Sequence, residues 1–229
     1  MTTEKEAERA YLKARRSQVR DRNLEATIAK SAYWSYRYAC SVVEGKWPKG
    51  EAAIALSGEA SYYYARDVLG DRFKRGEASI LQSPRDAAFY ATDILYGPWK
   101  RAERTIAKDA ECACHYAREA LNGRFALGER VIARSPKWAA YYATHIVRGR
   151  WRKGEKAMMQ ESEWMLCYAQ QALRSQLPTV MHNAMVLMSS SGDAYAKKYC
   201  SIKEYMTPTP QKRRTTKGPS RKKAISSKP

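Results

Sequence analysis

Two stretches decide the fold: residues 135–143 read Ser-Pro-Lys-Trp-Ala-Ala-Tyr-Tyr-Ala, and residues 149–155 read Gly-Arg-Trp-Arg-Lys-Gly-Glu. Variants of both recur along the chain every 26 residues. The Tyr-Ala pairs begin at Tyr38, Tyr64, Tyr90, Tyr116, Tyr142 and Tyr168. A glutamate keeps the same interval at Glu25, Glu51, Glu77, Glu103, Glu129 and Glu155. Such a period is typical of stacked supersecondary units and not of a single globular core.

Within one copy, the residues predict two short helices. Ser83 and Pro84 are typical of an N-cap and a first-turn proline. The same N-cap slot is filled in other copies by Ser31, Ser57, Asp109 and Ser135. We expect this first helix to end at a glycine in the left-handed conformation. These glycines are Gly45, Gly97, Gly123 and Gly149. A second, shorter helix then carries the repeated glutamate.

Isolated helices of about 13 and 9 residues are marginal in water, so the copies must stack on one another. The sequence therefore predicts an all-α fold, an α-solenoid of six tandem two-helix repeats. We expect residues 1–22 to form a charged capping helix, 23–178 the repeats, 179–206 C-terminal capping helices, and 207–229 a disordered basic tail. The repeat pattern fails after Ala169, because Met181 takes the place of the next glutamate.

The chain is strongly basic. Its 229 residues include 42 Lys and Arg against 23 Asp and Glu, a formal net charge of +19. The segment 207–229 contains eight basic and no acidic side chains. An excess of this size indicates a polyanionic partner, and nucleic acid is the first candidate. The tail residues that we assign to this partner are Lys212, Arg213, Arg214, Lys217, Arg221, Lys222 and Lys223.

The connection between the two helices of each copy is also basic. Because the repeat interval is constant, these loops should lie along one edge of the stack, which would extend over roughly 40–50 Å at the usual helix packing distance. We expect the side chains of this edge to contact phosphates with weak sequence preference. They are Lys46, Lys49, Arg72, Lys74, Arg75, Lys100, Arg101, Arg124, Arg150, Arg152 and Lys153.

Two residue columns beside this edge allow two interpretations each. An aromatic residue in five of the loops is a candidate wedge between paired helices. These residues are Trp47, Phe73, Trp99, Phe125 and Trp151. The three tryptophans among them, Trp47, Trp99 and Trp151, would instead be platforms on which unpaired bases stack if they are exposed. The repeated glutamate is either a first-turn carboxylate favoured by the helix dipole, or a partly buried acid. In the second case it would pair with Arg or Lys, or accept a tyrosine hydroxyl from the adjacent copy.

Signals of catalysis are weak. His115, His145 and His182 do not share a repeat position, and the sequence has no phosphate-binding loop, dinucleotide-binding glycine pattern or nucleophile elbow. Cys112, Cys114 and His115 lie close together in the sequence, but this spacing is not that of a zinc site. We expect no enzyme activity, cofactor or metal, and five reduced cysteines. No apolar run could span a membrane and the N-terminus is charged, so we expect an intracellular protein without a membrane partner.

The combined pattern is Ser-Pro-x-x-Ala-x-Tyr-Tyr-Ala followed by Gly-Arg-Trp/Phe-x-x-Gly-Glu-x-x-Ile. It resembles tandem repeats of uncharacterised proteins from large bacteriophages and related viruses. The resemblance covers roughly residues 24–173 and does not include the basic tail. It implies a viral origin and a helical array, and it implies no activity. With that origin the protein would act in the host cytoplasm, or in the nucleus of a eukaryotic host.

The sequence thus predicts a non-catalytic nucleic-acid-binding protein, with DNA and RNA both open as ligands. An alternative is a protein-interaction scaffold, such as a viral factor that holds a host protein in the groove of the stack. Tyrosines are good interface anchors, and those that could line such a groove are Tyr33, Tyr62, Tyr63 and Tyr141. A glycosylase-type enzyme on a helical repeat is a third alternative, for which no catalytic carboxylate or base is evident.

Overall fold

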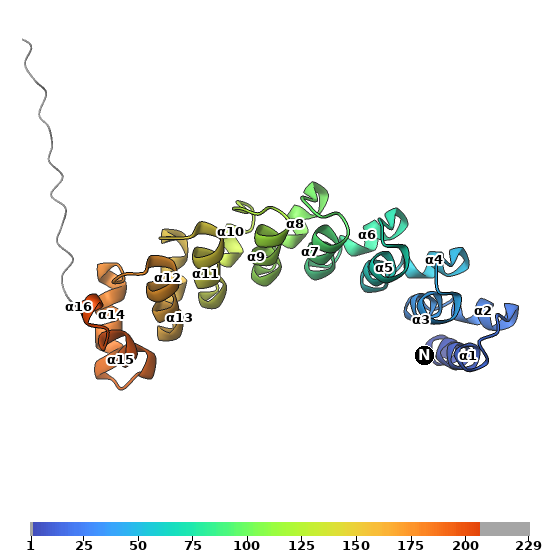
Figure 1. Ribbon diagram of the computed structural model, residues 1–229, viewed down its shortest axis with the longest axis horizontal. Coiled ribbons are helices and arrows are strands. Elements are labelled where there is room, and N and C mark those ends of the chain that lie inside the picture. Colours follow the sequence, from blue (N-terminus) through green and yellow to red (C-terminus); the bar gives the residue numbers. More distant parts are fainter. Residues whose placement is uncertain (1, 207–229) are drawn as a thin grey trace, which may run out of the picture.

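A computed structural model describes residues 2–206 of the protein. These residues form sixteen α-helices and contain no β-strand, so the predicted all-α class is confirmed. The helices follow one another in a single, gently curved row (Figure 1). One set lies on the concave underside of the row and is called the inner helices; the other lies above it and is called the outer helices.

The repeated tyrosines belong to the inner set. The inner helices are α1 (Thr2–Ser17), α3 (Ala32–Tyr38), α5 (Gly58–Tyr64), α7 (Pro84–Asp93), α9 (Ala110–Glu119), α11 (Pro136–Tyr142), α13 (Ser162–Cys167) and α15 (Ala194–Cys200). Four of them continue into a wider, π-helical turn. These turns are η1 (Ala39–Val43), η2 (Ala65–Leu69), η5 (Ala143–Val147) and η6 (Tyr168–Leu173).

The repeated glutamates belong to the outer set. The outer helices are α2 (Arg22–Ile28), α4 (Pro48–Ile54), α6 (Glu77–Ile80), α8 (Glu103–Ile106), α10 (Glu129–Ile132), α12 (Arg152–Met158) and α14 (Thr179–Ser190). Two are preceded by a single 3₁₀ turn, η3 (Lys74–Gly76) or η4 (Lys100–Ala102), and α16 (Lys203–Met206) ends the described chain. The six glutamate-bearing helices have only four to seven residues. Helices this short depend on packing against their neighbours.

The predicted N-caps are confirmed. At the beginning of five inner helices, the side-chain oxygen of the predicted N-cap residue accepts a hydrogen bond from the backbone amide three residues later, at 2.8–3.4 Å. The five capping residues are Ser31, Ser57, Ser83, Asp109 and Ser135. Because these caps satisfy amides that a helix leaves unpaired, they fix where each inner helix begins.

The predicted left-handed glycines are wrong by one residue. At the ends of the six inner helices that carry the repeated tyrosines, the left-handed residues have φ between 45° and 61° and are Glu44, Gly70, Tyr96, Asn122, Arg148 and Arg174. Gly45 follows the left-handed residue, and its amide donates to the Ala39 carbonyl six residues earlier at 3.1 Å. That bond spans one residue more than the 6→1 bond of a Schellman motif, because the helix ends in a π-helical turn, and the left-handed residue comes one position before the final donor. The left-handed conformation that recurs at the end of each of these helices is thus adopted by five non-glycine residues and one glycine.

The core runs along the row as one continuous cluster. All six repeated tyrosines are completely buried. The five loop aromatics are also buried, with 1–5% of their surface exposed, and they contact the tyrosine rings; Trp47, for example, lies 4.7 Å from Tyr38 between ring centroids. The wedge interpretation is therefore confirmed for these aromatics, and none of them is available to stack on a base.

Additional helices close both ends of the row. The residues that α1 buries are Ala7, Ala10, Tyr11 and Ala14. At the other end, the Tyr199 hydroxyl accepts the Leu177 amide at 3.1 Å and contacts His182 Nδ1 at 2.9 Å. His182 thus replaces the glutamate, and the repeat packing continues past Ala169, where the sequence pattern ends. The predicted disordered tail, residues 207–229, lies outside the described residues.

Candidate nucleic-acid interface

Each repeated glutamate lies against a buried tyrosine that comes 13 residues later in the chain. The six tyrosine hydroxyls donate to these carboxylates at 3.2–3.5 Å. Five of the same hydroxyls also accept the backbone amide of a loop aromatic, at 2.8–3.0 Å. Burial raises the pKa of Tyr142 to about 12, although the Phe125 amide opposes the shift. We call the six carboxylates the glutamate ladder; the interpretation of the repeated glutamate as a partly buried acid is confirmed.

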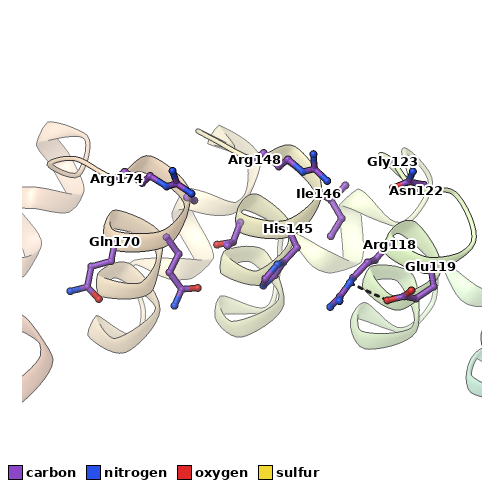
Figure 2. Close-up of a pocket in the computed structure, with 12 residues that line it drawn as sticks. Arg118, Glu119, Asn122, Gly123, His145, Ile146, Arg148, Gln170 and Arg174 are labelled. Atoms are coloured by element: carbon purple, nitrogen blue, oxygen red, sulfur yellow. Dashed lines mark ion pairs between the residues drawn. The ribbon is translucent and has the colours of Figure 1, made fainter.

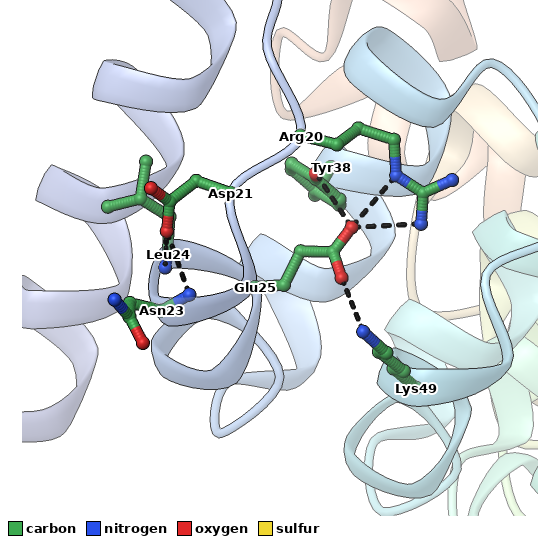
Figure 3. A network of polar contacts seen from close by, with 7 residues as sticks. All are labelled: Arg20, Asp21, Asn23, Leu24, Glu25, Tyr38 and Lys49. Atoms are coloured by element: carbon green, nitrogen blue, oxygen red, sulfur yellow. Dashed lines mark hydrogen bonds and ion pairs between the residues drawn. The ribbon is translucent and has the colours of Figure 1, made fainter.

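Basic side chains form ion pairs with the carboxylates of the glutamate ladder. Glu25 is 4% exposed at its side chain, and it accepts hydrogen bonds from Arg20 Nε at 2.9 Å and Lys49 Nζ at 2.8 Å (Figure 3). Burial acts to raise the pKa of Glu25, but the bonds from Lys49 and Arg20 outweigh it and hold that pKa below its usual value. Because Glu25 lies on α2 and Lys49 on α4, this ion pair links two neighbouring outer helices.

The same arrangement recurs at every second glutamate. Glu77 pairs with Arg72 at 2.6 Å and with Arg101 at 3.6 Å. Glu129 pairs with Arg124 at 2.6 Å and Lys153 at 2.7 Å. The intervening glutamates have one cation each, in the pairs Lys46–Glu51 at 4.0 Å, Lys100–Glu103 at 3.0 Å and Arg150–Glu155 at 2.7 Å. Eight of the eleven predicted loop cations are therefore engaged with the ladder.

The predicted loop cations nevertheless remain accessible. The eight that pair with the ladder keep 44–81% of their side-chain surface exposed. Lys74, Arg75 and Arg152 are exposed and make no ion pair within residues 2–206. The five loops (44–49, 70–75, 96–101, 122–127 and 148–153) contain twelve basic and two acidic residues. With the five glutamates that follow them, the edge keeps an excess of five positive charges, or four without Arg148, which also lines the groove described next.

Sequence reasoning missed a basic groove that lies along the inner helices, on the surface that we call the inner face. This open groove has a volume of about 1340 Å³ and lies where α9, η5 and η6 end. Figure 2 shows Arg148 and Arg174 at equivalent places on neighbouring helices, with Arg118 and His145 lower on their helices. Arg148 and Arg174 are the left-handed residues described above, so the backbone geometry that ends each helix also positions them.

An aromatic pocket adjoins this groove. It has a volume of about 500 Å³, and its rings are those of Phe89, His115, Trp138 and Tyr141. Phe89 and His115 lie 4.6 Å apart between ring centroids. All four side chains are partly exposed. The available signal was the column directly before each repeated tyrosine, which reads Arg37, Tyr63, Phe89, His115, Tyr141 and Cys167.

No metal centre is evident in the part of the chain that the structure describes. Cys112 and Cys114 are buried on α9, and residues 2–206 contain no group of three His, Cys, Asp or Glu side chains able to hold a metal ion. All five cysteines have free thiols. Within the same residues, no helix combines the length and the apolar character needed to cross a bilayer.

Comparisons of the chain with protein-family models, with curated proteins and with solved structures find no match. The fold and the site by themselves define an all-helical protein with a basic outer edge and a partly aromatic inner face. A function for it must therefore follow from the charge and geometry of those two surfaces.

Proposed function

We propose that the protein is an α-solenoid of six tandem two-helix repeats that binds nucleic acid without catalysis. The loop edge and the basic tail would contact phosphates. The observation that carries the proposal is the excess of five positive charges on the loop edge, with cations that stay about half exposed or more although the ladder pairs most of them. Phosphate binding through such an edge depends on charge and not on base sequence.

The glutamate ladder supports this function by positioning the arginines. Arg124 uses Nε and Nη2 on Glu129, at 2.8 and 2.6 Å. A guanidinium group has five N–H donors, so others remain for a phosphate. An arginine held in place loses less conformational entropy on binding than a free one. The ladder glutamates also neutralise part of the positive charge of the eight cations that they pair with. Lys74, Arg75 and Arg152 have no such partner in the described part of the chain, so their contacts with phosphates would account for most of the counterions that the nucleic acid releases on binding.

A salt titration tests the proposal. Five phosphate contacts on duplex DNA give a log–log slope of about −4.5, or several hundred-fold weaker binding between 50 and 200 mM salt. Neutralising Lys74, Arg75 and Arg152 to Gln together should reduce that slope by about 2–3. The matched control neutralises Arg9, Lys13 and Arg16 of α1, which are also exposed. Equal effects of the two triple variants would contradict the loop edge as the site.

A chain that ends at Met206 separates the tail from the row of helices. If this shortened chain keeps a salt-dependent affinity that the loop variant weakens, the loops bind phosphate themselves. If it binds no DNA or RNA at any salt concentration, the loop edge is not the site. A retained share of affinity measures what residues 207–229 add to the full chain.

A second candidate function is a protein-interaction scaffold. Partly exposed inner-face tyrosines such as Tyr63 and Tyr141 favour it, since tyrosine is enriched among interface anchors. A host protein would be the partner if the viral origin that the repeat pattern implies is correct. Retention of a protein partner in 500 mM salt and after nuclease treatment would support the scaffold over the phosphate-binding edge.

A further inference from the structure

The basic groove of the inner face has more cations than its acids can neutralise. Arg118, Arg148 and Arg174 line it together with one acidic side chain, Glu119, which pairs with Arg118 at 3.0 Å. Arg148 and Arg174 make no ion pair within residues 2–206. Both are exposed and project from the ends of adjacent helices (Figure 2). Two uncompensated guanidinium groups thus face one open channel, which suits an extended polyanion.

Tyr141 joins this groove to the aromatic pocket. Its hydroxyl accepts a hydrogen bond from Arg118 Nη1 at 2.5 Å, and its ring lies 4.4 Å from that of His145. Both Arg118 and His145 line the groove, whereas Tyr141 lines the pocket. A ligand whose charged backbone follows the groove therefore has flat, partly exposed rings within reach on its inner side.

The acidic residues of the inner face restrict where a phosphate chain can run. Asp109 and Glu111 line the aromatic pocket at the beginning of α9, far from the end of that helix that meets the groove. Arg85 is the one basic side chain that lines the same pocket, and it lies over the Phe89 ring at 5.8 Å. The two carboxylates therefore leave the pocket with a net negative charge, which disfavours phosphates there. The arginines stand at the opposite, C-terminal ends of the same inner helices. A polyanion would thus place its phosphates in the groove and its uncharged groups over the pocket.

We infer that the inner face between α7 and η6 binds single-stranded nucleic acid. The phosphates lie along Arg118, Arg148 and Arg174, and unpaired bases stack on Phe89, His115 and Tyr141. Stacking on partly exposed rings needs a free base face, which a duplex hides within its own stack. The inference rests on the proposed function for its ligand class, but it assigns a surface that shares only Arg148 with the loop edge, and it assigns a single strand.

The test compares three probes with the full-length protein: a fluorescein-labelled 12-nucleotide single strand, its duplex, and a strand of equal length with abasic sites. Tyr141→Leu and Phe89→Leu remove rings but keep apolar side chains. We expect each to weaken single-strand binding about 5- to 150-fold, the range found for base–aromatic stacking. Duplex affinity should not change. Tyr195→Leu, a partly exposed ring on α15, is the matched control and should not affect any probe.

The abasic strand keeps the phosphates and lacks the bases, so it separates the contribution of the bases to the affinity from that of the phosphates. It should bind the unaltered protein more weakly than the normal strand does, and Tyr141→Leu should then cause no further loss. Because the leucine variants alter a side chain near the core, helical circular dichroism and the melting temperature check that they fold. The double variant Arg148→Gln with Arg174→Gln is fully on the surface. It should lower the single-strand salt slope by about 1.4, whereas Arg130→Gln with Arg134→Gln should lower it less.

The outcomes separate the two proposals. Loss of single-strand binding in the ring and groove variants, with the loop triple variant unaffected, supports the inner face and overturns the loop edge. Loss of binding only in the loop triple variant overturns the inner face alone. Capture of a protein on the inner face that single strands fail to displace also overturns it. A chain that binds none of the three probes overturns both.

Discussion

At the scale of single residues, one hydrogen-bonded group recurs through the protein. A buried tyrosine hydroxyl accepts the amide of a loop aromatic and donates to a ladder glutamate. The amide belongs to a loop that cannot bond it within a helix, so the hydroxyl satisfies a donor that would otherwise be buried alone. The carboxylate in turn is compensated by Arg124 of the preceding loop and by Lys153 of the next outer helix. Each tyrosine therefore connects the inner helix, the loop and the outer helix of neighbouring copies.

Removing one hydroxyl tests this connection. Tyr142→Phe keeps the ring but leaves the Phe125 amide, now bonded at 2.9 Å, buried without a partner. We expect a loss of about 1–3 kcal/mol in the free energy of unfolding, the usual cost of an unsatisfied buried donor. Urea denaturation followed by circular dichroism measures it. Tyr96→Phe, on a ring that is 83% exposed, is the control, and an equal effect of both substitutions would argue against the hydroxyl's role.

The ladder also predicts a pH dependence. Burial alone would raise the pKa of Glu129, but bonds from Lys153 and Arg124 lower it below its usual value. The ionised carboxylate therefore adds stability that is fully present above the unfolded pKa of about 4.3 and is lost as pH falls through the lower folded value. Glu129→Gln should cost about 1.5–3 kcal/mol at pH 7, the range for hydrogen bonds to charged groups.

The difference between the unaltered protein and Glu129→Gln should shrink as the pH is lowered from about 5 to 2. Thermal melts at several pH values measure it. Glu8→Gln is the matched control, since Glu8 is exposed on α1 and makes no ion pair within residues 2–206. A difference that is constant over this pH range would show that the carboxylate charge does not stabilise the fold.

At the scale of helices, the ends of the inner helices have the most uniform backbone. Six consecutive copies place a residue in the left-handed conformation at the same position, and only Gly70 among them is a glycine. For other residues this conformation costs about 1–2 kcal/mol, which the surrounding packing must offset. The same turn aims Arg148 and Arg174 into the basic groove, so helix termination and the candidate site share one geometry.

Two glycines at the ends of inner helices give different predictions, because Gly70 occupies the left-handed position and Gly45 comes one residue after it. Gly70 has φ +61°, so Gly70→Ala should lower the free energy of unfolding by about 1–2 kcal/mol. Gly45 is not left-handed, and an added Cβ there would meet no atom within 4 Å. Gly45→Ala should therefore change stability by no more than about 0.5 kcal/mol. Thermal unfolding of the two variants decides between the observed geometry and the expectation that Gly45 itself is left-handed.

At the scale of the whole molecule, the helices form a curved row in which contacts join near neighbours. α7, for example, packs against α5, α8 and α9, and the main contacts of every other helix are likewise with its own or an adjacent pair. Such an arrangement makes stability close to a sum of local and nearest-neighbour contributions. Damage in the middle should thus remain local, which differs from the all-or-none unfolding of a small globular domain.

Hydrogen exchange tests this locality. Ile106 is completely buried on α8, and Ile106→Ala should cost about 2–5 kcal/mol locally. We expect mass spectrometry to find the greatest loss of amide protection in α7 to α10, with α1 and α15 little affected. A uniform loss of protection over residues 2–206 would instead indicate a single cooperative core.

The sequence by itself determined the parts that depend on periodicity and local chemistry. The spacing of Tyr, Ala and Ile predicted the all-helical class, and Ser or Asp before each inner helix predicted its N-cap. Such features follow from backbone geometry within a few residues, which a pattern can reveal. The same repeat also located the basic loops, although it did not show that most of their cations face a buried carboxylate.

Only the tertiary structure decided which residues meet between copies. Lys49 and Glu25, 24 residues apart, are brought together because neighbouring outer helices pack side by side. The same packing buries Trp47 and its counterparts, shifts the left-handed turn to residues such as Arg148, and brings Arg118 to Tyr141 on the inner face. These contacts depend on the angle and offset between successive helix pairs, which result from side-chain packing and leave no mark in any single copy of the repeat.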